Sequence, residues 1–158
     1  MEHSIALGYQ TGEHSSGHHN LLMGLRAGQY IQGENNVGFG QEVLARALSG
    51  DYNIGIGHIA CRGHSSNSTT RSFHNNIGIG YEALTDLNMA QNNVCIGRSA
   101  GHGIQNGNYN VAIGNDSGKA CHSGHNNISL GRSSGFAGFA GFAGFAGFGC
   151  LLYTSDAA

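Results

Sequence analysis

The sequence predicts an all-β protein, a parallel β-solenoid or β-roll of about eight coils, each 16 or 17 residues long. Three observations predict this class. A motif of one apolar residue, one mostly small residue, a second apolar residue and a glycine occurs eight times. The closing glycines follow one another at 16, 16, 17, 23, 17, 17 and 17 residues. An asparagine precedes the motif in seven of the eight copies. Self-similarity at such a fixed period is the signature of a repeat architecture.

Each apolar–small–apolar triplet predicts a short β-strand, because two apolar residues separated by one residue have period 2. The two large side chains then point to one face and the small residue points to the other. The turn glycines are Gly8, Gly24, Gly40, Gly57, Gly80, Gly97, Gly114 and Gly131. We expect the apolar pairs to form the core, with Val37, Phe39, Ile54, Ile56, Ile77, Ile79, Val94, Ile96, Val111, Ile113, Ile128 and Leu130 as members.

The asparagine register predicts a corner of the coil, since asparagine tolerates left-handed backbone and bonds neighbouring backbone groups. Its members are Asn20, Asn36, Asn53, Asn76, Asn93, Asn110 and Asn127, and Ser4 stands there in the first copy. In a stack of coils these side-chain amides can bond one another as a ladder. Independent turn residues are the alternative.

A second register begins three residues after each glycine and contains mostly small residues, such as Ala27, Ala60 and Ala100. It predicts a shorter, inward-facing segment followed by a polar loop. Within that loop, residues 42–50 (EVLARALSG) and 81–90 (YEALTDLNMA) suggest single helical turns.

The amount of apolar surface in one coil predicts an oligomer. A coil of 17 residues offers only two large apolar side chains. A thin stack therefore buries little surface against the entropy lost on ordering the chain. We expect a homo-oligomer whose chains approach one another through the small-residue face.

The motif N-V-A-I-G-x-x-S/A-G, present as Asn110 to Gly118, resembles the head repeats of trimeric autotransporter adhesins (YadA-like), which are also similar to segments of bacteriophage tail fibres. The resemblance covers Ser4 to about Gly135. It implies a left-handed parallel β-roll, a homotrimer, and a role in adhesion or receptor engagement. The repeat is longer here than is usual in the autotransporter heads. No stalk heptads, barrel anchor or autocleaving chaperone domain occur in this sequence.

Two other patterns in the sequence have a structural explanation as well as a functional one. Residues 55–60 and 78–83 match the G-x-G-x-x-A dinucleotide fingerprint, but they lie within the repeat and lack a crossover helix.

Histidine and cysteine residues offer possible metal ligands. One register on separate coils contains His18, His74 and His125, and a short stretch of sequence contains Cys121, His122 and His125. The favoured interpretation is that all of them are polar loop residues. We expect no catalytic, cofactor or metal site. The nine acidic residues suggest no paired carboxylates on neighbouring coils.

The fifth copy contains six extra residues, and insertions in solenoids often form the binding face. The candidate contact loop consists of Ser65, Ser66, Asn67, Ser68, Thr69, Thr70, Arg71 and Ser72. A neutral surface insertion is the alternative. The sequons at Asn67, Asn115 and Asn127 are expected by chance in a chain rich in Asn and Ser.

The chain consists of three segments. Residues 1–135 hold the β-roll repeats. Residues 136–149 repeat Gly-Phe-Ala and suggest a collagen-like helix, a linker or an artefact. Residues 150–158 (CLLYTSDAA) resemble a translated sequencing adapter, so we exclude them from the fold. Cys61, Cys95 and Cys121 then form an odd set without a disulfide framework.

Function follows from the resemblance and the composition. We expect a non-enzymatic fibre segment that displays receptor-contacting loops, either on a bacterial cell surface or in a virion tail fibre. The partner is a host cell-surface receptor or glycan. A net charge of −2 gives no footprint for nucleic acid, and no apolar run suggests membrane insertion. The alternatives are a solenoid module that binds glycan or ice, and a solenoid enzyme that cleaves glycans.

Overall fold

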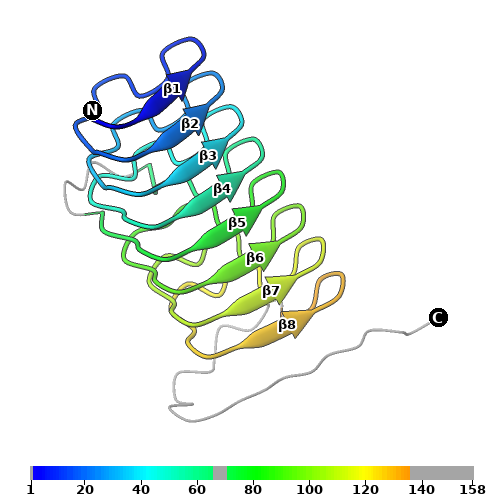
Figure 1. Ribbon diagram of the computed structural model, residues 1–158. Helices are drawn as coiled ribbons and strands as arrows, with labels where there is room; N and C mark the ends of the chain where they lie inside the picture. The colour runs from blue at the N-terminus through cyan, green and yellow to red at the C-terminus, as the bar shows by residue number, and fades with distance from the viewer. Residues whose placement is uncertain (1, 66–70, 136–158) are drawn as a thin grey trace.

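The protein is a β-solenoid with one short strand in each coil (Figure 1). The computed structural model describes residues 2–65 and 71–135, and in these ranges it is all-β, as predicted. The Gly-Phe-Ala segment, the adapter-like segment and Ser66 to Thr70 lie outside the described residues. The strands are β1 (Ile5–Leu7), β2 (Leu21–Met23), β3 (Val37–Phe39), β4 (Ile54–Ile56), β5 (Ile77–Ile79), β6 (Val94–Ile96), β7 (Val111–Ile113) and β8 (Ile128–Leu130).

The strands form one parallel sheet in the order of the chain, from β1 to β8. Each motif pairs with the same position of the next motif, as in β6 and β7, where Cys95 lies opposite Ala112 and Ile96 opposite Ile113. The pairing keeps this register across the insertion between β4 and β5. We number each coil after its strand, so that coil n ends at the glycine that follows βn. The predicted strands are therefore confirmed residue by residue.

The interior of the solenoid is lined by the middle residue of each strand, not by the apolar pair. From β2 to β8 the middle residue is buried, whereas the residues on either side of it are half-buried or exposed. The expectation that the pairs listed above, from Val37 to Leu130, form the core is thus wrong for the single chain. The small residues face the chain's own interior, so they are not the face through which separate chains approach.

The interior is thin because the strand faces the following turn at close range. The middle strand residue lies two positions before the closing glycine. It packs against the residue four positions after that glycine. Gly38 and Gly78 stand opposite Leu44 and Leu84, whose side chains fill the space. Around Gly97 the order is reversed, because Cys95 fills the space and a Cβ on Gly101 would collide with the Sγ of Cys95. Around each of the eight closing glycines, one of these two positions is itself glycine.

The segment after the strand is a continuous turn rather than a helix. In coil 4, Glu42, Leu44 and Arg46 have φ of 51°, 53° and 64°, so every second residue is left-handed. A right-handed helix requires negative φ at consecutive residues, and the alternation excludes it. The helical turns suggested for residues 42–50 and 81–90 are therefore absent. Backbone groups bond between coils instead, as in the bond from Leu44 N to Ala60 O at 3.0 Å.

The predicted asparagine ladder is confirmed by its hydrogen bonds. Asn76 is fully buried, and its Oδ1 accepts from the backbone N of Asn93 at 3.1 Å and from Asn93 Nδ2 at 2.9 Å. Its Nδ2 donates to Asn53 Oδ1 at 3.1 Å and to Ala90 O at 2.9 Å. The same pattern continues from Asn20 to Asn127. Each interior amide is satisfied on both sides, as a buried polar group requires.

Candidate functional site

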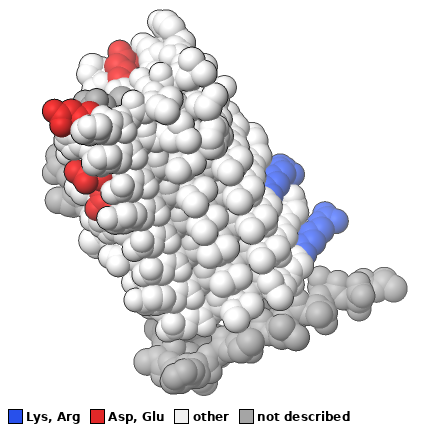
Figure 2. Space-filling model, in the orientation of Figure 1, with Lys and Arg blue, Asp and Glu red and all other residues white. Residues whose placement is uncertain are grey.

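The outer face of the sheet is the first candidate surface, and we call it the apolar face. It consists of the first and third residues of every strand, and all sixteen of these residues are apolar. Eight of them expose 36 to 63% of their surface: Ile5, Leu7, Ile54, Ile56, Ile96, Ile113, Ile128 and Leu130. Figure 2 shows a broad face without charged side chains over the strands, with acidic groups toward one edge and basic groups toward the other.

The apolar face is long because its strands are stacked without a shift. Seven steps of about 4.8 Å between neighbouring strands make it roughly 34 Å long. A contiguous exposed apolar patch on a soluble protein marks an interaction site. Its chemistry is that of a packing surface, because aliphatic side chains offer no group for catalysis.

The insertion in coil 5 is anchored at both ends. Before it, the backbone N of His64 donates to Leu87 O at 2.8 Å, and after it the backbone N of Ser72 donates to Asn88 O at 3.0 Å. Ser65 is exposed, but Arg71 is buried, and its burial together with the nearby charge of Arg46 lowers the pKa of Arg71. The expectation that the whole segment projects from the coil is therefore wrong for Arg71, and residues 66–70 lie outside the described ranges.

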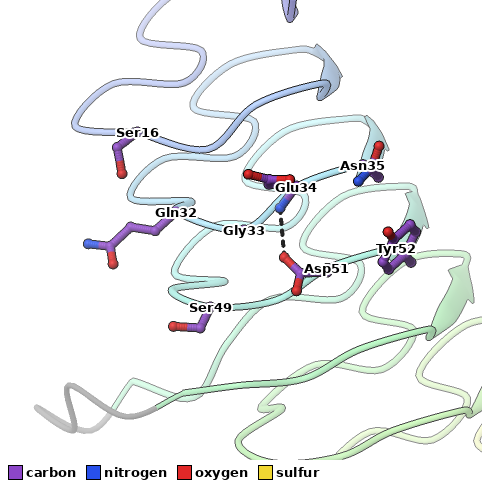
Figure 3. A pocket seen from close by; sticks show the side chains of 8 residues that line it. All are labelled: Ser16, Gln32, Gly33, Glu34, Asn35, Ser49, Asp51 and Tyr52. Atoms are coloured by element: carbon purple, nitrogen blue, oxygen red, sulfur yellow. Dashed lines mark hydrogen bonds between the residues drawn. The ribbon is translucent and has the colours of Figure 1, made fainter. Parts of the chain in front are cut away.

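A second candidate surface is a hollow of about 460 Å³ at the corner that precedes the strands of coils 2 to 4 (Figure 3). We call it the polar hollow, and it is lined by Ser16, Gln32, Gly33, Glu34, Asn35, Ser49, Asp51 and Tyr52. Hydroxyl, amide and carboxylate groups supply most of its lining. One aromatic ring, that of Tyr52, lies at the side nearest the strands.

The carboxylate of Asp51 is held in place by the backbone. Its Oδ1 accepts a hydrogen bond from the backbone N of Glu34 at 2.7 Å, drawn in Figure 3. Its own backbone N donates to His74 Nδ1 at 3.1 Å, and that ring nitrogen lies 3.3 Å from Asp51 Oδ2. Asp51 is thereby fixed between the coils above and below it.

The polar hollow corrects one expectation from the sequence. Glu34 and Asp51 both stand six residues before a closing glycine, in neighbouring coils, so a pair of carboxylates does share a register. The hollow itself was not predicted. Counting acidic residues against the closing glycines would have found the pair, since that numbering is common to all coils.

The histidine register contributes to stacking. His18, His74 and His125 each accept, through Nδ1, the backbone N–H of the residue at the same position one coil earlier, at 3.1 to 3.2 Å. They lie on separate coils and do not meet. Across residues 2–65 and 71–135 no three potential ligands come together at a metal-binding distance. The fingerprint-like residues 55–60 and 78–83 lie in β4, β5 and the turns that follow.

Comparisons with protein-family models, with curated proteins and with solved structures returned no match. In the part of the chain that the structure describes, no helix is long and apolar enough to cross a bilayer. The functional argument therefore starts from the two surfaces, the apolar face and the polar hollow.

Proposed function

We propose that the protein is a non-enzymatic segment of an adhesive fibre, in which three identical chains pack through their apolar faces. The fibre belongs to a bacterial cell-surface adhesin or to a phage tail, as the repeat motif implies. The observation that carries this proposal is the apolar face. Sixteen aliphatic, methionine or phenylalanine side chains in one register favour a buried contact rather than a solvated surface.

Identical copies are the occupant that fits this face best. Every rung of the face has the same chemistry, so a copy aligned at the same height meets apolar side chains along the whole length. The face contains no charged residue to direct a different partner. Closed symmetry around an axis parallel to the solenoid buries the face of every chain, and the head-repeat resemblance favours three chains.

A fibre of this kind gains adhesion from repetition. Three weak contacts presented on one rigid rod bind a repetitive cell surface more tightly than one contact does, because the second and third binding events are intramolecular. Ladders that continue from coil to coil supply the rigidity, and no chemical step is needed.

The assembly is tested by multi-angle light scattering of the purified 158-residue protein. We expect a mass of three chains of 16.4 kDa each. Ile96→Glu places a charge in the centre of the apolar face, and we expect this variant to dissociate, since an unpaired charge cannot be buried cheaply. Labelled trimer should bind cells that the Ile96→Glu variant does not retain after washing.

Met89→Glu is the matched control. Met89 is also apolar and exposes 52% of its surface, but it lies outside the strands. This variant should keep the mass of the trimer. A wild-type protein that is folded by circular dichroism and has the mass of one chain would contradict the proposal.

A further inference from the structure

We propose that the polar hollow is a binding site for a neutral pyranose sugar, such as the exposed residue of a cell-surface glycan. This inference names the ligand class for the adhesive role proposed above. The site itself is formed by one chain, so its binding can be measured whether or not the trimer exists.

The size and the lining of the hollow fit one sugar ring. A volume of about 460 Å³ lies in the range of small-molecule sites. Ser16, Gln32 and Ser49 offer groups that both donate and accept, and these match the hydroxyls of a sugar. The carboxylates of Glu34 and Asp51 accept hydrogen bonds only, and a hydroxyl that donates to a carboxylate forms one of the stronger kinds of hydrogen bond.

Tyr52 supplies the aromatic wall of the site. Tyr52 exposes 60% of its surface, and its backbone is left-handed, with φ of 58°. Coils 3, 5, 6 and 8 place asparagine at this position, which tolerates left-handed backbone better than tyrosine does. The left-handed backbone at this register is common to all eight coils and belongs to the repeat, whereas the exposure of Tyr52 leaves its ring free to contact a ligand. The electron-rich face of the ring offers a stacking surface for the C–H groups of a sugar.

The orientation of Asp51 prepares the site before any ligand arrives. The bond from Glu34 N fixes Oδ1, and the bond from Asp51 N to His74 Nδ1 holds the backbone of Asp51 in place. A group held by its neighbours loses little rotamer freedom on binding, which preserves affinity. Figure 3 shows Gln32, Ser49 and Ser16 extending from three successive coils on the side of the hollow away from Tyr52.

Charge selects the class of sugar. The lining contains two carboxylates and neither lysine nor arginine. A sialic or uronic acid would place its own carboxylate near Glu34 and Asp51 without a compensating cation, and this repulsion disfavours it. Neutral hexoses and N-acetylhexosamines meet no such penalty.

The hollow stays clear of the proposed trimer contact. Its residues stand five to eight positions before a closing glycine, whereas the apolar face uses the residues one and three positions before it. A trimer would therefore carry three hollows at one height, and a branched or clustered glycan could engage more than one of them.

Saturation-transfer NMR on the purified protein tests the inference. The probes are the methyl glycosides of glucose, mannose, galactose and N-acetylglucosamine, with the methyl glycoside of N-acetylneuraminic acid as the anionic comparison. We expect saturable transfer to at least one neutral glycoside and none to the sialoside. Tyr52→Ala and Asp51→Asn should each weaken that binding on the order of tenfold, as loss of a stacking partner or of a charged acceptor predicts.

Tyr109→Ala is the matched control, because Tyr109 stands at the same register, has φ of 58° and is also 60% exposed, but lies outside the hollow. It should leave the affinity unchanged. Absence of transfer to every neutral glycoside from the folded protein would overturn the inference, as would unchanged binding in both variants of the hollow. The Ile96→Glu variant separates the two proposals: sugar binding that persists without a trimer supports the site alone, whereas a trimer that binds no sugar supports the assembly alone.

Discussion

The asparagine at the corner of each coil illustrates how much one side chain determines in this molecule. Its amide joins three coils, since it bonds the corner residues above and below it and a carbonyl of the next coil. In the described solenoid Asn36, Asn53, Asn76 and Asn93 are fully buried. An amide of this size has two donor hydrogens and one acceptor oxygen with two lone pairs, and here both ends are used. Aspartate cannot replace it, because a carboxylate has no hydrogen to donate.

Asn76→Ala is predicted to destabilise the solenoid by about 3 kcal/mol or more, because it leaves the backbone N of Asn93 and the carbonyl of Ala90 buried without these bonds. Urea unfolding at one protein concentration, followed by circular dichroism, measures this change.

Asn127→Ala is the control for that measurement. Asn127 is half-buried, and its Nδ2 donates to Asn110 Oδ1 at 2.9 Å. Fewer buried groups depend on it, so we expect a loss of about 1 kcal/mol. Equal losses for the two variants would show that the ladder does not act as the hydrogen bonds indicate.

At the scale of the strand and its following turn, a side chain at one interior position is matched by a glycine at the position that faces it. A coil has room for one side chain between the middle strand residue and the residue that faces it across the coil. Around Gly57 these two positions hold Gly55 and Cys61, and around Gly97 they hold Cys95 and Gly101. Protein interiors are close-packed, so an added side chain has no free volume to occupy.

The swap of Cys95 and Gly101 tests this rule. Gly101→Cys alone should destabilise the protein by about 3 kcal/mol, because the new side chain meets Cys95. Cys95→Gly alone should cost about 1 kcal/mol for the lost packing. The double variant reproduces the arrangement of Gly55 and Cys61 around Gly57 and should recover most of the stability, which gives a coupling free energy between the two sites. Additive losses in the urea unfolding of the four proteins would contradict the rule.

The strands, their register and the corner ladder follow from the sequence, because each depends on a local pattern that repeats at a fixed distance. The direction of the strand faces does not follow from it. We assigned the large residues to the core, as in most proteins. That assignment fails because the two walls of the coil lie too close together to hold Ile54 and Ile56, and Gly55 faces inward instead. The distance between the two walls is set when the coil closes. The alternation of large and small residues along one strand does not reveal that distance.

The polar hollow was missed for a related reason. Its lining comes from three coils, and no single repeat contains more than part of it. The turn segments were also misread, since the apolar spacing of residues 42–50 fits a helix while the actual backbone alternates in handedness. Local periodicity is shared by both conformations, and only the bonds to neighbouring coils favour the one observed.

At the scale of the whole molecule, the solenoid should protect its buried thiols from alkylation more strongly than its partly exposed thiol. Burial raises the pKa of Cys61 to about 12 and also raises the pKa of Cys95. Both thiols are fully buried in middle coils, whereas Cys121 in coil 8 is only half-buried. The thiolate is the reactive species, so a buried thiol with a raised pKa reacts only after its coil opens.

Alkylation by iodoacetamide at pH 8 checks this in a Cys150→Ser background. Cys121 should be labelled first, and Cys61 and Cys95 should react at least tenfold more slowly until urea is added. Mass spectrometry of the digested protein identifies each labelled site. Labelling of Cys61 as fast as that of Cys121 would mean that the centre of the stack opens as readily as the coil near its end.

The in-register pairing of similar triplets has a consequence for how the gene of such a protein can change. Unequal crossing-over between two repeats removes or duplicates a complete coil, and the strands on either side of the join can pair in the parallel register that all the strands share. The rod then becomes shorter or longer by one strand spacing, about 4.8 Å. Recombination can therefore change the length of the rod on either side of the hollow without altering the residues that line the hollow.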